Sequence, residues 1–160
     1  MSILRYLMLL SLVLWIGGGI FFALVLAPTA FQVLPNPHLA GNVVARALEK
    51  LHWIAIISGI VFLISSLAHS RLMNGTAHVF AMRNLLVCVM LVLTLVSQLG
   101  IIPRMNTLRA SLGDFAAVPL NNPQRVQFEA LHVWSTRLEG GVLLLGLVVV
   151  YMAGSTIGRR

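Results

Sequence analysis

Charged residues are scarce in this sequence. Of its 160 residues only 9% are Asp, Glu, Lys or Arg, whereas 59% are hydrophobic, and the mean hydropathy is +0.95. A soluble domain is about 25% charged, so this chain has too few charges to cover a surface that faces water. The composition excludes an ordinary soluble domain and predicts an integral membrane protein, whose first partner is the lipid bilayer.

Acidic residues and cysteine are scarcer still. The chain has four acids against 11 Lys and Arg, which gives a formal net charge of +7, and it has one cysteine. The basic residues are scattered and form no patch of the kind that binds nucleic acid, so we interpret them as topology determinants at the membrane edges. The single Cys88 excludes an internal disulfide, and its place in an apolar run predicts a small buried residue.

Long apolar runs, in contrast, occur four times. At roughly 20 residues for each crossing of the bilayer, they predict spans at about 4–27, 51–68, 84–102 and 136–154, within a single membrane domain of residues 1–160. A secretory signal peptide is the competing interpretation of the first run, but its apolar core would hold only about 7–15 residues. We therefore expect a retained span and an all-α fold, an integral membrane four-helix bundle.

Prolines and asparagines divide the chain between these runs. Pro28 predicts the end or a kink of the first helix, and Pro103 predicts the end of the third, each followed by a loop. Asn36-Pro37 and Asn122-Pro123 each predict a helix start, with Asn as the N-cap and Pro at the first helical position. Since no strong helix breaker lies between Pro37 and Ser70, we expect one helix there of roughly 50 Å.

A stripe of small residues follows one face of the first run. Gly19, Ala23 and Ala27 recur at intervals of four residues, so they share one side of a helix. Small residues in this arrangement allow another helix to approach closely within a membrane. We expect this stripe to be a packing face, rather than flexible glycine-rich chain that faces lipid.

The same short motif occurs twice. Glu49 and His52 are three residues apart, as are Glu129 and His132, and a Trp follows each histidine within two residues. On a helix this spacing puts the carboxylate and the imidazole on one face. Each copy lies where a polar segment turns into a long apolar run.

The two halves of the chain match in other ways. Pro28 corresponds to Pro103 at an offset of 75 residues, and Glu49 to Glu129 at an offset of 80. This pattern predicts two αα-hairpins in a parallel internal repeat, related by an approximate two-fold axis along the membrane normal. The repeat would place both motifs on the same side of the membrane at similar depth.

The paired motif suggests a site for a metal ion or a haem. A full di-iron site needs an acid from each of the other two helices, and the first and third spans contain none. A single transition-metal ion held by Glu49, His52, Glu129 and His132 is one hypothesis, and haem ligation by His52 and His132 is another. The alternative is that Glu, His and Trp form an anchor at the membrane–water boundary without a ligand.

The fourth span contains two ionisable residues. Its uncharged part, residues 142–153, has only 12 residues and cannot cross about 30 Å of hydrocarbon, so the span includes Glu139 and Arg137. Ionisable groups at membrane depth usually face the bundle interior or water and are functional candidates. The alternative is a snorkelling Arg137, with Glu139 near the lipid headgroups.

The side of the membrane follows from the basic residues. Arg5, Arg71, Arg83 and the terminal Arg159-Arg160 share the side of the two termini, which holds no acid. The other six basic residues and all four acids lie in or beside the two long loops, and long loops weigh less in the positive-inside rule. The rule then predicts that both termini are cytoplasmic, in the inner (plasma) membrane of a cell, with the paired motifs at the outer mouth of the bundle.

Three stretches add a resemblance to known proteins. They are Leu14-Trp15-Ile16-Gly17-Gly18 with Ala27-Pro28-Thr29-Ala30-Phe31, then Ile102-Pro103-Arg104-Met105 with Leu108-Arg109, then Phe128 with Leu131-His132 and Ser135. Together they resemble the small four-span bacterial membrane proteins similar to the transmembrane protein 205 family. The first stretch is also similar to copper-resistance D-type membrane proteins and to the opening span of the four-span protoporphyrinogen oxidase. The resemblance implies a membrane four-helix bundle and no particular reaction.

Several functions remain open at this point. Besides a protein that binds a metal ion or haem, the sequence allows a membrane transporter or export protein acting as a homodimer. It also allows an accessory structural subunit of a larger membrane complex. The chain has no Ser-His-Asp or Cys-His nucleophile set and no phosphate-binding glycine loop, so the sequence does not indicate a hydrolase.

Overall fold

The structure is a computed structural model that describes residues 2–75, 80–113 and 118–155, and helices make up nearly all of it. In chain order the elements are α1 (Ser2–Leu12), η1 (Val13–Gly17), α2 (Gly18–Phe21), η2 (Phe22–Leu26), α3 (Ala27–Val33), α4 (Pro37–Asn74), α5 (Met82–Val96), η3 (Ser97–Ile101), α6 (Ile102–Leu112) and α7 (Pro123–Ser155). The η segments are π-helical turns within longer helices. The described residues include no strand, so the all-α prediction is confirmed.

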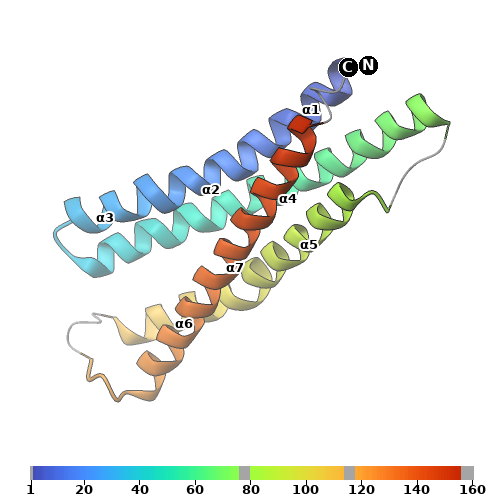
Figure 1. The fold of residues 1–160 in the computed structure, drawn as a ribbon. Coiled ribbons are helices and arrows are strands. Elements are labelled where there is room, and N and C mark those ends of the chain that lie inside the picture. Colours follow the sequence, from blue (N-terminus) through green and yellow to red (C-terminus); the bar gives the residue numbers. More distant parts are fainter. Residues whose placement is uncertain (1, 76–79, 114–117, 156–160) are drawn as a thin grey trace.

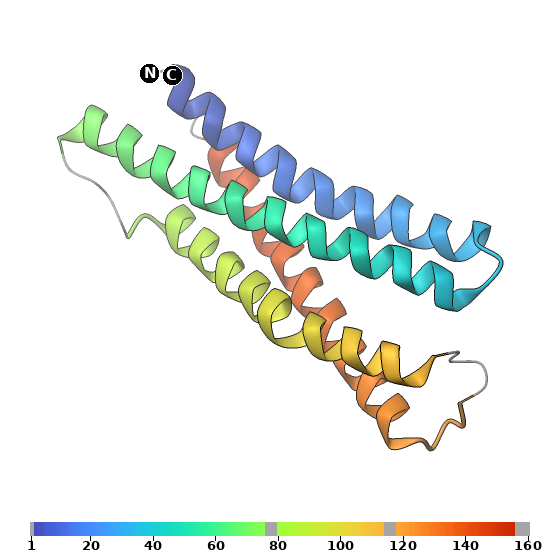
Figure 2. The ribbon, with the colours of Figure 1, turned by 180° about the vertical axis from the view of Figure 1, so that it is seen from behind.

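These elements form four long rods. Helices long and apolar enough to cross a membrane cover Ile3–Val33, Pro37–Met73, Met82–Leu112 and Pro123–Gly154. The first rod runs against α4 as one hairpin, and α5 to α6 run against α7 as the other (Figure 1). Seen from behind, the chain starts and ends at one end of the bundle (Figure 2). The predicted membrane four-helix bundle is therefore confirmed.

Both predicted helix starts are confirmed by their caps. The side chain of Asn36 accepts a hydrogen bond from the backbone N–H of His38 at 2.7 Å, and α4 begins at Pro37. Asn122 Oδ1 accepts from the backbone N–H of Gln124 at 2.9 Å, just before α7. Each side chain satisfies an N–H that a helix start leaves without a partner. The helix α4 then continues for 38 residues, about 57 Å at 1.5 Å per residue, which agrees with the expected long helix.

The loops predicted after the two prolines are largely helical instead. The first rod passes Pro28 and ends at Val33, and the third passes Pro103 and ends at Leu112. A proline ring clashes with the carbonyl four residues earlier and lacks an N–H. Those carbonyls belong to residues 24 and 99, which lie in η2 and η3. We infer that the wider π-helical turn accommodates the ring, so each helix continues where the sequence predicted an end.

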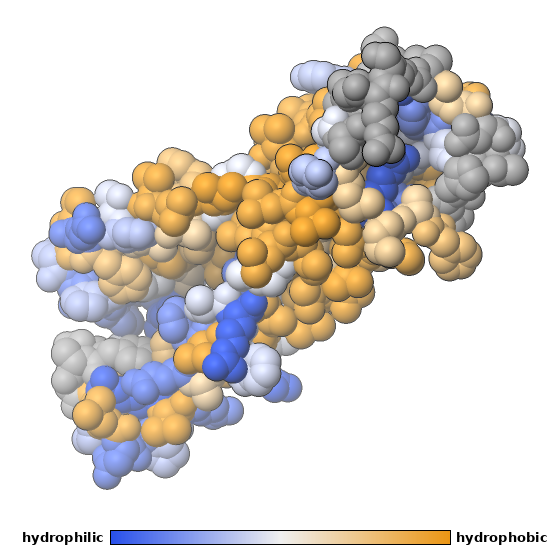
Figure 3. All heavy atoms as spheres, viewed as in Figure 1, coloured by the Kyte–Doolittle hydropathy of each residue, from blue (hydrophilic) through white to orange (hydrophobic). Residues whose placement is uncertain are grey.

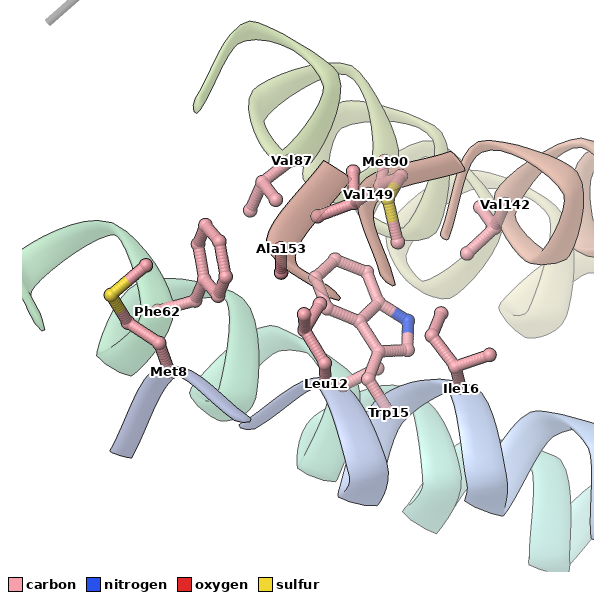
Figure 4. Packing of buried hydrophobic residues seen from close by; sticks show 11 residues of the cluster. Met8, Leu12, Trp15, Ile16, Phe62, Val87, Met90, Val142, Val149 and Ala153 are labelled. Atoms are coloured by element: carbon pink, nitrogen blue, oxygen red, sulfur yellow. The ribbon is translucent and has the colours of Figure 1, made fainter. Parts of the chain in front are cut away.

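The hydrophobic core lies in the half of the bundle that holds the termini. The Trp15 indole sits in its centre, among side chains from the first rod, α4, α5 and α7 (Figure 4). A Cβ atom added at Gly59 would lie 2.6 Å from both Trp15 and Leu91, so only glycine lets these helices approach so closely. The core therefore joins the two hairpins firmly at this end.

The opposite end of the bundle is open. There the α3–α4 hairpin and the α6–α7 hairpin separate, and the surface between them is hollowed (Figure 3). The predicted packing stripe faces this region: Gly19, Ala23 and Ala27 line the space. Only Gly19 shows close packing, since an added Cβ there would lie 2.8 Å from Leu143 of α7. The stripe thus serves mainly as the wall of a cavity.

One residue prediction is wrong and others fall outside the described residues. Cys88 is exposed on α5, because the neighbours Val87 and Met90 occupy the inward face of that helix. The apolar residues on the same face of α5 as Cys88 can therefore contact lipid instead of the protein core. The basic pair Arg159-Arg160, which the topology prediction counts, lies beyond the described residues.

Candidate functional site

A cavity of about 420 Å³ lies at the open end of the bundle. Ligand sites for small molecules are typically about 300–1,000 Å³, mostly apolar, with a few polar groups, and this cavity fits that description. Its polar lining residues are Asn106, Arg109, His132, Ser135, Thr136 and Glu139. Its apolar lining residues come from all four rods: Phe22, Ala23, Ala27, Phe31, Val44, Ala45, Leu48, Leu51, Ile102, Met105 and Leu143, with Gly19, Gly41 and Gly140.

A buried histidine lies behind the lining residue Glu139. His52 of α4 is only 1% exposed, and both of its ring nitrogens have partners. Nδ1 lies 3.0 Å from Oε1 of Gln98 in η3. Nε2 pairs with Oε1 of Glu139 on α7, a residue that also lines the cavity. Three of the four rods therefore meet at one imidazole.

The charges of this group can be counted from its hydrogen bonds. An amide oxygen only accepts, so Nδ1 of His52 is the donor wherever Oε1 of Gln98 faces it. With Nδ1 as the donor, the contact of Nε2 with Glu139 is a hydrogen bond only if a second proton lies on the imidazole or on the carboxylate. Both arrangements have zero net charge. A pair without net charge avoids the cost of burying one.

The break in the third rod helps to place Gln98. It lies in η3, five residues before Pro103, and its side chain is buried. The hydrogen bonds of a π-helical turn span one more residue than those of an α-helix. The extra residue rotates the preceding side chains about the helix axis relative to their places in a regular α-helix. We attribute the inward position of Gln98 to this turn. Such turns are frequent at functional sites.

The structure does not bring the two predicted motifs together as a cluster. His52 contacts neither Glu49 nor His132 in its hydrogen bonds. Glu129 is exposed and pairs with Arg125 one turn earlier at 3.1 Å.

The second histidine of the paired motif is exposed. His132 stacks on Phe128, with ring centroids 6.4 Å apart, and it reaches the cavity. In the described part of the chain, no group of three or more His, Cys, Asp or Glu is arranged to hold a metal ion. Binding of a metal or haem by the paired motif stays a prediction, which elemental analysis and an absorption spectrum would test.

The two ionisable residues of the fourth span behave differently. Glu139 turns inward to His52, and its side chain is only 25% exposed. Arg137 is exposed, and its guanidinium lies 5.5 Å from the ring centroid of Trp134, which is also exposed. Arginine against an exposed Trp is typical of a membrane boundary. Glu139 therefore faces the bundle interior, and its functional role stays a prediction.

Sequence reasoning missed the polar residues on α6 and in η3. Because a loop was expected after Pro103, Asn106 and Arg109 were not placed on any helix face. Residues 102, 105, 106 and 109 do follow the spacing of one helical face, and all four line the cavity. This helical spacing could have indicated that Asn106 and Arg109 share one face of a helix. For Gln98, the indication was a polar side chain within a long apolar run.

These features define a class of protein. Four membrane-length helices line a cavity, and Glu139, which pairs with the buried His52, forms part of its wall, so the chain is a multi-pass membrane protein. Residues 10–113 match the family described as Domain of unknown function (DUF4149), which is more than half of the chain, and the protein belongs to this family. No curated protein and no solved structure matches the chain.

Proposed function

We propose that this protein is a membrane carrier that takes a small molecule into the cavity and couples its movement to the shared proton of His52 and Glu139. One observation carries the proposal: Glu139 is at the same time a wall residue of the cavity and the partner of a buried histidine. Ionisable groups inside membrane bundles mark substrate and ion pathways. This carrier is the transporter that the sequence left open.

The shared proton gives the coupling its physical basis. With the proton the pair is neutral, and without it a net negative charge lies between the buried His52 and the cavity. The cost of that charge favours rearrangement of the helices that hold the two residues, α4 and α7. Release of the proton and a change in helix arrangement are thereby linked.

The bundle has an element suited to such a change. The third rod is interrupted by η3 and Pro103 next to Gln98, and the first is interrupted by η2 just before Pro28. Interruptions of this kind act as hinges in helices. The core around Trp15 would hold the other end of the bundle together while the hairpins move at the open end.

The proposal includes an orientation in the membrane. Arg5, Arg71 and Arg83 lie at the end of the bundle that holds the termini, whereas the three described acids lie in the other half. The other six described basic residues lie in that half too, beside the longer connections, and such loops weigh less in the positive-inside rule. On that weighting, cytoplasmic termini in an inner membrane and a cavity that opens to the outside are part of the proposal. The parallel internal repeat is supported by η2 and η3, which are offset by the same 75 residues as Pro28 and Pro103.

The resemblance to the transmembrane protein 205 family also belongs to this proposal. It agrees with four spans, and a family resemblance by itself names no substrate. A homodimer of carriers, or membership of a larger membrane complex, would leave the cavity of each copy as described.

Cysteine accessibility tests the carrier directly. In a Cys88→Ala background, Thr136→Cys places a thiol in the cavity, and Leu147→Cys places one on the exposed apolar side of the same helix as a control. A charged, membrane-impermeant methanethiosulfonate reagent is applied to right-side-out and to inside-out vesicles. A carrier exposes its cavity alternately, so Thr136→Cys should react from both sides, and Leu147→Cys from neither.

The proton link is tested in the same vesicles. Glu139→Gln removes the shared acid group, so the ratio of the two labelling rates should shift and should lose its dependence on pH. Reaction of Thr136→Cys from one side only, at every pH, would show a fixed pocket and would refute the carrier.

A further inference from the structure

We infer that the molecule bound in the cavity is an amphipathic anion, with one compact acidic head on Arg109 and an apolar tail along the wall formed by the first rod. The inference rests on the proposed function, because it names the class of substrate for the same cavity. Three features support it: the setting of Arg109, the charge balance of the cavity, and the arrangement of its apolar wall.

The guanidinium of Arg109 is held at the cavity without an acidic partner in the described chain. It is partly buried and lies 5.2 Å from the ring centroid of Phe128. On its other side it faces the backbone of α4, since a Cβ added at Gly41 would lie 3.9 Å from its Nε and Nη2 atoms. No carboxylate of the described residues pairs with it. Arginine fixed in this way presents its hydrogen-bond donors to an anion.

The charge balance of the cavity favours an anion. If the lining histidine, His132, is neutral, Arg109 and Glu139 are the only residues along the cavity that carry a full charge. Glu139 is already balanced by His52 through the shared proton. Arg109 is therefore the uncompensated charge of a mostly apolar space, where the field of a single cation is less screened than in bulk water. A neutral or cationic ligand would leave this charge unpaired.

The remaining wall suits a hydrocarbon chain. Phe22, Ala23, Ala27 and Phe31 follow the first rod along the cavity, and Val44 faces them from α4. Apolar contact of this kind contributes roughly 25 cal/mol for each Å² removed from water. Because the cavity opens where the two hairpins separate, a tail can enter from the membrane while the head stays at Arg109. Asn106 and Thr136 offer further hydrogen-bonding groups beside the head.

The guanidinium fork matches a carboxylate and a phosphate equally well. The acidic head could therefore come from a free fatty acid or from a phosphorylated lipid. The chemistry they share, a compact acidic oxygen group on an apolar chain, is what the structure specifies. The two sources are separated by experiment.

Displacement of a fluorescent fatty acid tests the inference on the wild-type protein. The protein in phosphatidylcholine nanodiscs binds dansyl-undecanoic acid, and four competitors with the same twelve-carbon chain are compared: dodecanoate, dodecyl phosphate, dodecanol and dodecyltrimethylammonium. Dodecanoate, dodecyl phosphate or both should displace the probe at concentrations at least about tenfold below those of the neutral and cationic compounds. Equal displacement by all four would overturn the inference, and the stronger of the two acids identifies the source.

Variants locate the head and the tail. Arg109→Gln should weaken binding of the probe at least about tenfold, since it removes charge-assisted hydrogen bonds, and Arg109→Lys should restore part of it. Arg104→Gln is the matched control, because it removes the same charge from an exposed position on the same helix. Ala23→Leu narrows the cavity beside the first rod and should weaken binding of the probe without changing the preference for acids. Unchanged binding in Arg109→Gln would overturn the assignment of the head.

The two proposals fail in different ways. If Thr136→Cys reacts from both sides but acids have no advantage, the carrier stands and the substrate class is wrong. If acids bind through Arg109 but the cavity reacts from one side only, the site is a fixed receptor for an amphipathic anion and the carrier is wrong.

Discussion

His52 and Glu139, which are 87 residues apart in the sequence, form an ion pair that joins the two hairpins of the bundle. The histidine is buried, and the glutamate stands between it and the cavity. Since the hairpins otherwise separate at this end, the pair is one of the few polar links between them. It therefore affects both stability and the shape of the cavity.

Removal of Glu139 should destabilise the protein clearly. Glu139→Ala leaves a buried imidazole without its partner, and the loss of one member of a buried pair is strongly destabilising. Because the carboxylate is partly exposed, we expect about 2–4 kcal/mol in the free energy of unfolding, measured by denaturation in mixed detergent micelles. The matched control is Glu129→Ala, whose pair with Arg125 is exposed, and it should cost less than about 1 kcal/mol.

A double-mutant cycle shows whether the effect belongs to the pair. His52→Ala, Glu139→Ala and the double variant should give a coupling energy of about 1–3 kcal/mol. If the double variant costs as much as the two single variants together, the side chains do not interact and the site is misassigned.

Much of the fold was accessible from the sequence. Four long apolar runs require four spanning helices, because backbone N–H and C=O groups in lipid need hydrogen-bond partners within the protein. The Asn-Pro pairs at residues 36–37 and 122–123 identified two helix starts to the residue. The helix end predicted at Pro103 was wrong, and of the end or kink predicted at Pro28 the end was wrong, since a π-helical turn before each proline keeps the helix continuous. Such a turn depends on packing that a local pattern does not contain.

Only part of the site could be predicted from the sequence. The fourth span was too short without Glu139, and this argument marked the residue as a candidate, which stays a prediction. Its partner could not be named, because His52 was expected to face Glu49 on its own helix, and the pair instead crosses between α4 and α7. Local spacing describes contacts within one helix, whereas the packing of the hairpins decides which faces meet.

Gln98 should hold the proton of His52 in place. Gln98→Leu leaves the Nδ1–H group of a buried ring without an acceptor, which costs about 1–3 kcal/mol. The expected result is a lower free energy of unfolding together with a change in the ¹⁵N shifts of His52, which report the position of its protons. Gln127→Leu, an exposed change on α7, should stay within about 0.5 kcal/mol. A neutral Gln98→Leu with unchanged shifts would contradict the hydrogen bond.

Glycine at position 59 should be required for packing of the core. A methyl group added by Gly59→Ala would meet Trp15 and Leu91 at 2.6 Å, so we expect a loss of about 1–3 kcal/mol from overpacking. Gly140→Ala is the control, since nothing lies within 4 Å of its added Cβ, and helix propensity predicts a gain of up to about 1 kcal/mol. Equal effects of the two substitutions would show that the close approach at Gly59 is absent.

Cys88 should face lipid in the membrane. The apolar run around it suggested a buried residue, but its side chain lies on the exposed face of α5, next to the buried Val87. A nitroxide label on Cys88 should therefore collide often with dissolved oxygen, which partitions into lipid, and rarely with a water-soluble nickel chelate. A label on Val87→Cys in a Cys88→Ala background should collide rarely with both, because it lies in the core. Low collision rates with both reagents at Cys88 would instead show that this face of α5 is covered, for example by a second copy of the chain.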